Sequence, residues 1–231
     1  MIRQSKIFLI LSFLLVVSWS ASAQYVFESK KAEKLYLKLE EYYEAADYEK
    51  ILKAEPDIEA MFFEKQDTLT ALMYSFLAES YYFGMDDLLK GIELYKQEYE
   101  LREKLPETKG EDQIDLIYNL ATVMDEAGMY TEAEDLYLST IEKLDKRNVD
   151  VYEYYVLGLL THYTNTSEAD KGLKAYRKYR SIFKKESFAK AMGLKSEGDF
   201  LEIKGQFTKA IDRYEEALEL LEVIGYYPSR E

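Results

Sequence analysis

The 231-residue chain contains no cysteine, only three prolines and a single histidine, His162. The lack of cysteine excludes disulfide bonds, thiol catalysis and cysteine-based metal sites, so cohesion must come from packing. With one histidine, a zinc site would have to rely on carboxylates, which zinc rarely uses alone. No nucleophile motif accompanies any serine, and the ten dispersed glycines form no phosphate-binding loop. We therefore expect no catalytic residues, no metal site and no cofactor.

Basic residues are also scarce relative to acidic ones. The 30 Lys and Arg against 44 Asp and Glu give a formal net charge of −14. Nucleic acid is an unsuitable partner, because neutralising its phosphates needs clustered Lys and Arg. The acidic excess fits a solvated exterior or a preference for basic partners. The 22 tyrosines suit half-exposed surfaces, where a large apolar ring must end in a polar tip.

Long apolar runs are limited to one, over residues 7–17. It follows the basic residues Arg3 and Lys6 and precedes Ala21-Ser22-Ala23, a pattern typical of a secretory signal peptide. Spanning a membrane takes about 20 apolar residues, so this run is too short to be an anchor. We predict that residues 1–23 are a signal peptide. The mature protein is then exported to a bacterial periplasm or the extracellular space, without stable membrane insertion.

The stretch from 114 to 144 is the clearest in the chain, with two amphipathic helices joined by a turn at 127–129. In the first helix, Leu116, Leu120 and Val123 recur at steps of four and three. Those steps place apolar side chains along one face of a helix. The stretch therefore predicts a helical hairpin with one buried face.

Several residues predict where helices begin and end. Gly128 can take the left-handed conformation that ends a helix, and Thr131 with Glu134 resembles a capping box at the start of the next. Pro56 predicts a break in the second helix of the first hairpin, and Pro106 ends the second hairpin.

The hairpin pattern recurs along residues 24–231, which we predict to form one domain. We place five hairpins over residues 32–64, 70–105, 114–144, 151–184 and 191–224. A small or apolar residue marks the same position of each second helix: Ile51, Gly91, Ala133, Gly172 and Ala210. The steps between these positions are 40, 42, 39 and 38 residues. Such regular spacing argues against an ordinary helical bundle with accidental periodicity.

The central hairpin resembles a tetratricopeptide repeat (TPR), whose pattern is present as Leu120-Ala121, Gly128-Met129-Tyr130, Ala133 and Tyr137. The period near 40 exceeds the 34 residues of the basic repeat and is similar to the longer repeats of kinesin light chain. The resemblance covers nearly the whole predicted mature chain. It implies an all-α fold, a right-handed superhelical solenoid of antiparallel helix pairs, acting as a non-catalytic protein-interaction scaffold.

In that family the first helix of each pair lines a concave groove, which holds an extended peptide or a partner helix. The matching positions imply these partner-binding residues: Glu79, Tyr82, Asp115, Tyr118, Asn119, Thr122, Asp125, Tyr155 and His162. Asn119 matches an asparagine that kinesin light chain-type members use to hydrogen-bond a peptide backbone. Asp115 and Tyr118 replace the basic residues that hold a terminal carboxylate in chaperone-binding members. We expect a protein or peptide partner with apolar anchors and some basic residues.

Other interpretations remain open at this point. The chain could be a glycan-binding module that stacks sugars on Tyr82, Tyr118, Tyr155 and Tyr163, or the recognition portion of a longer protease or sensor. Each tyrosine can equally pack between neighbouring hairpins. The last hairpin has no obvious polar capping helix after it. We therefore expect it to dock on a second copy, giving a homo-oligomer, or on another partner, or else to be followed by the rest of a longer protein.

Overall fold

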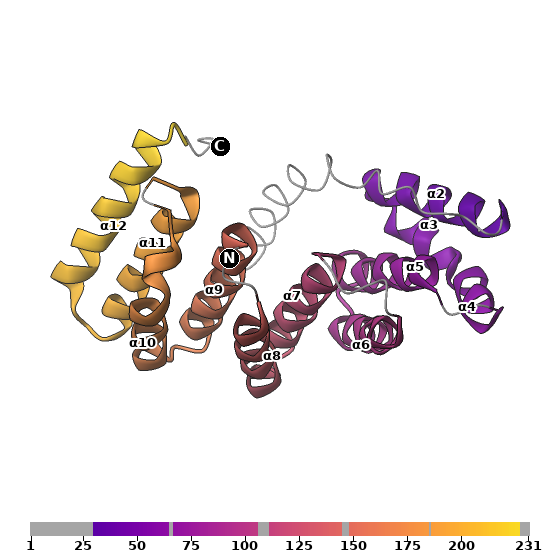
Figure 1. Cartoon of the computed structure of the whole chain (residues 1–231), viewed down its shortest axis with the longest axis horizontal. Helices are drawn as coiled ribbons and strands as arrows, with labels where there is room; N and C mark the ends of the chain where they lie inside the picture. Colours follow the sequence, from indigo (N-terminus) through magenta and orange to yellow (C-terminus); the bar gives the residue numbers. More distant parts are fainter. Residues whose placement is uncertain (1–29, 65–66, 106–110, 145–147, 185, 227–231) are drawn as a thin grey trace.

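The computed structural model describes residues 30–64, 67–105, 111–144, 148–184 and 186–226. Within these ranges the chain is helical and contains no β-strand. The predicted signal peptide and Pro106 lie outside the described residues. Successive helices run back and forth in one arching row, from α2 at one end to α12 at the other (Figure 1). This arrangement is the all-α superhelical solenoid that the sequence predicts.

Each unit of the solenoid consists of a first helix and a second helix. The first helices are α2 (Lys30–Glu44), α5 (Thr68–Glu79), α7 (Glu111–Glu126), α9 (Val149–Asn165) and α11 (Phe188–Ile203). The second helices are α3 (Tyr48–Lys53) with α4 (Glu55–Glu64), α6 (Leu88–Lys104), α8 (Tyr130–Lys143), α10 (Ala169–Tyr179) and α12 (Phe207–Val223). A π-helical turn, η1 (Ser80–Gly84), extends α5, and a 3₁₀ turn, η3 (Arg180–Ile182), extends α10.

Aspartates start several of these helices. The side chains of Asp47, Asp67 and Asp87 each accept a hydrogen bond from the backbone N–H three residues later. Such bonds satisfy backbone donors that have no partner inside the helix. The break predicted near Pro56 is confirmed, because α3 ends at Lys53 and Pro56 lies in the first turn of α4.

The turn between α7 and α8 agrees with the sequence at Gly128 but not at Thr131. Gly128 has a φ of 77°, the left-handed conformation expected where a helix ends. However, α8 begins at Tyr130, and the residue before it, Met129, makes no side-chain capping bond. The prediction of Thr131 as the N-cap is therefore wrong. Glu134 does not fold back over the helix start and instead contacts the next unit.

The core forms two apolar clusters that meet at α7. Leu116, Leu120 and Val123 of α7 belong to a cluster shared with the first two units. Ala121, one residue on, belongs to a second cluster shared with α9, α10 and α11. The helix therefore buries one side against the preceding unit and another against the following unit.

The interface between α7–α8 and α9–α10, called the 3–4 interface here, is tight at Gly158 of α9. A Cβ atom on Gly158 would lie 2.7 Å from ring carbons of both Tyr118 and Tyr137. Real Cβ atoms do not approach other heavy atoms so closely, and close packing leaves these rings little room to move. Gly158 therefore sets how near α9 can lie to the tyrosines of α7 and α8.

We expect Gly158→Ala to destabilise the protein by about 1–2 kcal/mol. Overpacking costs about 1–3 kcal/mol, and the better helix propensity of alanine offsets only part of it. Urea unfolding followed by circular dichroism measures the difference. Thr161→Ala, at an exposed position on the same helix, is the control and should leave stability nearly unchanged. A Gly158→Ala protein as stable as the wild type would contradict the tight contact.

Candidate functional site

The first helices α5, α7 and α9 lie on the inner side of the arch, and α6, α8 and α10 lie on its outer side (Figure 1). We call the solvent-facing side chains of these first helices the inner wall. The predicted partner-binding residues differ widely in exposure. Asp115 is exposed; Glu79, Tyr118, Asn119 and Thr122 are half-buried; Tyr82, Asp125, Tyr155 and His162 are buried. The structure thus brings only part of the predicted set to a surface that a ligand can reach.

Three of the reachable residues lie in one line on α7. Asp115, Asn119 and Thr122 follow at steps of four and three, so they share one helix face. The Thr122 hydroxyl donates to the Tyr118 carbonyl at 3.0 Å and lies 3.2 Å from the Tyr137 hydroxyl. Among the described residues, the side-chain amide of Asn119 has no hydrogen-bond partner. Asn119 therefore retains its full donor and acceptor capacity for a ligand.

The tyrosines of the predicted groove mainly join units three and four. The Tyr118 and Tyr154 rings stack with centroids 3.9 Å apart, and Tyr118 also meets the edges of Tyr137 and Tyr155. Tyr155 is fully buried, and its hydroxyl donates to the Ile114 carbonyl. Burial raises the pKa of Tyr118 to about 12, which keeps its hydroxyl neutral. These rings serve packing first, and only Tyr118 and Tyr154 retain partial exposure.

Tyr82 has a comparable packing role one unit earlier. Its ring is buried in η1, and its hydroxyl donates to Oε1 of Glu126 on α7 at 2.7 Å. Glu126 is otherwise exposed at the end of the inner wall. The bond therefore ties unit two to unit three while leaving an acidic group at the surface.

Glu79 stands at the junction of the inner wall with the core of unit two. Burial raises the pKa of its carboxyl to about 7, and the negative charges of Glu98 and Asp115 add to the increase. A hydrogen bond from the Tyr43 hydroxyl partly opposes the shift. Glu79 therefore changes its charge near neutral pH, unlike an ordinary surface glutamate.

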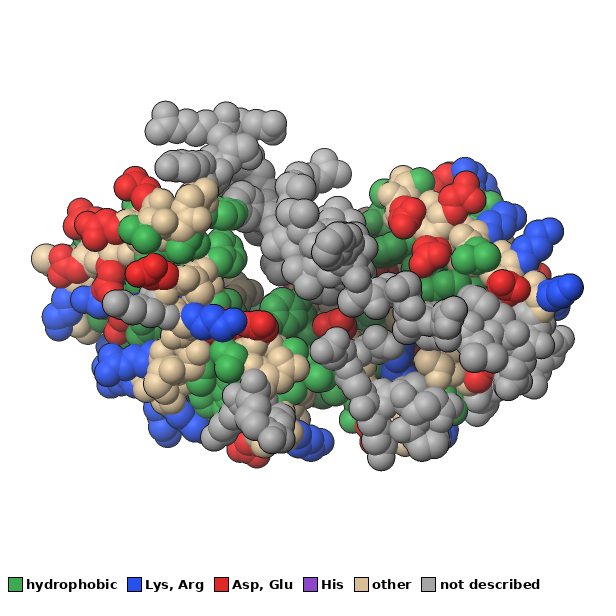
Figure 2. Space-filling model, turned by 45° about the horizontal axis from the view of Figure 1, so that its top comes forward, with side chains coloured by type: hydrophobic (Ala, Val, Ile, Leu, Met, Phe, Trp, Pro, Cys, Tyr) green, Lys and Arg blue, Asp and Glu red, His purple; other side chains and the backbone are tan. Residues whose placement is uncertain are grey.

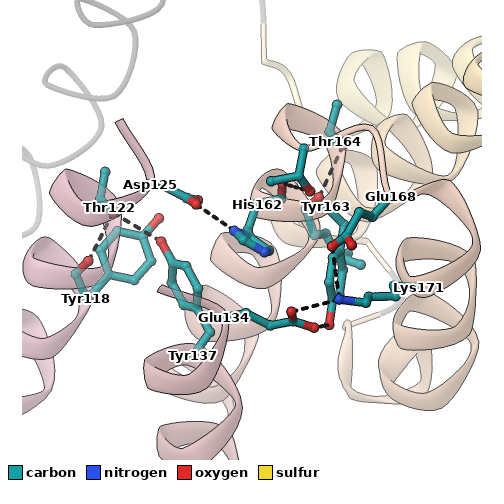
Figure 3. A network of polar contacts seen from close by, with 12 residues as sticks. Tyr118, Thr122, Asp125, Glu134, Tyr137, His162, Tyr163, Thr164, Glu168 and Lys171 are labelled. Atoms are coloured by element: carbon teal, nitrogen blue, oxygen red, sulfur yellow. Dashed lines mark hydrogen bonds and ion pairs between the residues drawn. The ribbon is translucent and has the colours of Figure 1, made fainter. Parts of the chain in front are cut away.

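Two of the predicted partner-binding residues that are buried, Asp125 and His162, meet in a polar cluster at the 3–4 interface (Figure 3). His162 Nδ1 lies 2.6 Å from Asp125 Oδ1. On the other side of the imidazole are Glu134 of α8, Glu168 before α10, and Lys171 of α10. We call these five residues the inter-unit cluster.

The cluster joins polar groups from α7, α8, α9 and the start of α10. Lys171 Nζ pairs with Glu134 Oε2 at 2.8 Å and with Glu168 Oε2 at 3.1 Å. The Tyr163 hydroxyl donates to Glu134 Oε1 at 2.7 Å. The sequence alone does not identify Glu134, Glu168 and Lys171 as members of this cluster, because nothing in their spacing shows that the solenoid places them beside His162.

Two surface hollows lie away from the predicted residues. One, of about 440 Å³, lies between α10, α11 and α12 and is lined by six basic residues, Lys174, Arg177, Arg180, Lys204, Lys209 and Arg213. Asp170, Glu197 and Asp212 line it as well and compensate part of this charge. The other, of about 640 Å³, lies between α6, α7 and α8. Figure 2 shows basic side chains along the C-terminal end of the molecule, at the left.

The last helix, α12, keeps an apolar stripe in solvent. Phe207, Ile211 and Leu218 are 63%, 54% and 59% exposed. The predicted homo-oligomer through this unit stays a prediction. Within the described ranges, no helix combines the length and the apolar character that crossing a membrane requires.

Comparisons with known proteins agree with this architecture. Residues 69–146 match the family model described as tetratricopeptide repeat. No curated protein sequence matches the chain.

Solved structures with the same fold cover most of the chain. The nearly identical TPR-like repeats of a Podosopora anserina kinesin light chain align with a TM-score of 0.68 at 12% identity, over 84% of this chain and 97% of that one. BtubC (BKLC) from P. vanneervenii aligns with a TM-score of 0.65 at 17% identity, over 84% of this chain and 80% of that one. MamA from RS-1 aligns with a TM-score of 0.61 at 13% identity, over 84% of this chain and 97% of that one. The chain is thus similar to TPR solenoids in fold, and its second and third units match the repeat in sequence as well.

Proposed function

We propose that this protein is a non-catalytic scaffold that holds an extended peptide or a partner helix along the inner wall. The observation that carries the proposal is Asn119, whose amide lies at the middle of the wall without a partner among the described residues. A side-chain amide can bind a backbone N–H and a backbone C=O at once. TPR solenoids typically bind protein partners, which supports the same function.

The inner wall also indicates the chemistry of the partner. Asp115 and Glu126 are exposed on either side of Asn119, so Lys or Arg in the partner would find opposite charges there. On α9, Tyr154 and Leu157 are half-buried and offer an apolar surface. A segment with one or two apolar anchors and flanking basic residues would fit both features.

A glycan ligand is less well supported. Sugar stacking needs an open aromatic face, and Tyr82, Tyr155 and Tyr163 are at most 7% exposed. Tyr118 is partly exposed, but one of its faces is covered by Tyr154. We further propose that the protein acts outside the cytoplasm, on the basis of the basic and apolar segments at residues 1–23.

We expect Asn119→Ala to weaken peptide binding about 5- to 30-fold, because an amide bonded to the peptide backbone contributes about 1–2 kcal/mol. Peptides selected from a random display library on the wild-type protein serve as ligands, and fluorescence polarisation gives their affinities. The control is Gln97→Ala, which removes an exposed amide from α6 behind the wall. Selection that yields no peptide, or equal affinities for the Asn119→Ala and wild-type proteins, would contradict the proposal.

The stability of the protein should also depend on pH, because Glu79 at the inner wall has a raised pKa. Its folded pKa, about 7, is above the unfolded value near 4.5. Between these two values the folded state binds more protons, so ionisation of Glu79 lowers stability as the pH rises. We expect Glu79→Gln to match the wild type at pH 4 and to be more stable by up to about 3 kcal/mol at pH 8.

Urea unfolding at a series of pH values measures this difference. Glu100→Gln, at an exposed position of α6, is the matched control and should show no such pH-dependent gain. A constant difference between Glu79→Gln and wild type from pH 4 to pH 8 would rule out the raised pKa.

A further inference from the structure

The only histidine of the chain has one ring nitrogen bonded and the other unused. His162 is 1% exposed, and its Nδ1 lies 2.6 Å from Asp125 Oδ1. Among the described residues, its buried Nε2 has no hydrogen-bond partner. A buried polar atom without a partner is costly, so such an atom usually has a specific role.

The unused nitrogen is directed toward two carboxylates. Figure 3 shows the Nε2 side of the ring facing the space between Glu134 and Glu168. One ligand atom each from Glu134, His162 and Glu168 lies within 4.8 Å of the other two. Atoms bound to one zinc ion at about 2 Å lie about 3.3 Å apart. Small side-chain movements would therefore bring the three atoms to coordination distance.

We propose that His162 Nε2, Glu134 and Glu168 bind one divalent transition-metal ion of the zinc type, with water completing the coordination. A neutral imidazole with two carboxylates suits such an ion, whereas calcium and magnesium prefer oxygen ligands alone. This inference is independent of the peptide-binding function proposed for the inner wall.

The groups around the three ligands are those that a metal site requires. When Nδ1–H of the neutral imidazole donates to Asp125, the lone pair lies on Nε2, and the bond fixes the ring orientation, as carboxylates behind zinc-bound histidines do. The Tyr163 hydroxyl donates to Glu134 Oε1 at 2.7 Å and so holds this carboxylate in place. Both ligand side chains are therefore oriented before a metal ion enters.

Lys171 now pairs with the two carboxylates that would bind the metal ion. Its ammonium group bridges Glu134 and Glu168 at 2.8 and 3.1 Å. The Lys171 side chain is 49% exposed, so it can swing into solvent and open the site. A metal ion would enter from the same side, because the side chains of Glu134 and Glu168 are 19% and 40% exposed. Lys171 is thus a competitor that tunes metal affinity.

A bound ion would connect α8, α9 and the turn before α10. It would link units three and four across the 3–4 interface, in the folded state only. Ligands that bind the folded state alone raise its stability with their concentration. The melting temperature should therefore rise when the ion is added.

Titration calorimetry of the full chain, freed of metals with a chelator, tests the site with Zn²⁺. Co²⁺ serves as a spectroscopic probe, since a histidine–carboxylate site gives it a visible absorption band. We expect one ion per chain. His162→Gln and Glu134→Gln should each weaken binding at least about 10-fold, and Asp125→Asn, a change behind the ligand, by about 10-fold.

Lys171→Met is the most specific variant, because it should strengthen Zn²⁺ binding about 3- to 10-fold by removing the competing ammonium. A merely structural lysine would give no gain. Lys204→Met is the matched control. Lys204 also forms an ion pair between helices, with Asp170 at 2.5 Å, but this pair lies outside the inter-unit cluster. Its affinity for Zn²⁺ should equal that of the wild type.

Three results would overturn the proposal: no Zn²⁺ binding by the wild type, unchanged binding by His162→Gln, or unchanged or weaker binding by Lys171→Met. Circular dichroism of each variant shows whether it folds. If His162→Gln does not fold, Glu134→Gln and Lys171→Met decide the outcome, because both change residues that are partly exposed.

Discussion

Each helical hairpin of this protein buries its apolar face against the next hairpin, because two amphipathic helices alone cannot cover both faces. At α7 this division is visible residue by residue: Leu120 packs toward the preceding units and Ala121 toward the following one. The solenoid therefore has no single central core. A series of interfaces between neighbouring hairpins determines its shape. The same interfaces determine how the side chains of the inner wall are arranged.

Tyrosine makes these interfaces possible in a chain without disulfide bonds. Its ring supplies apolar area, and its hydroxyl reaches a polar group at the edge of the interface. The Tyr82 hydroxyl reaches Glu126 across units two and three, and the Tyr163 hydroxyl reaches Glu134 across units three and four. Both bonds end on an acidic group, so part of the large acidic excess serves to satisfy buried tyrosines. Other acidic groups, such as Asp115, are exposed at the surface.

The sequence was sufficient to predict the solenoid and many of its turns. Gly128 adopts the predicted left-handed turn, and Pro56 accompanies the predicted break in a helix, because these features depend on local backbone chemistry. Thr131 was predicted wrongly, since a capping motif and an ordinary first turn share the same residue types. Local patterns thus predict helix ends well only where one residue type dominates.

The candidate site was harder to predict because exposure depends on contacts between units. Nine residues of α9 are buried, among them Tyr155 and His162, which the family pattern places in the groove. Helical periodicity shows that these residues share a broad face, but not whether a ligand or the next unit covers it. Tyr154 and Leu157, on the part of α9 that remains half-exposed, could be identified only from the packed structure.

The inner wall and the inter-unit cluster are physically connected through α7. Asn119 and Asp125 lie on the same helix, less than two turns apart, and Asp125 joins that helix to α9 through His162. Any change that tightens the contact between Asp125 and His162 also fixes the position of α7 relative to Tyr154 of α9. A ligand that contacts both α7 and α9 would therefore meet them in the relative position that the Asp125–His162 contact holds.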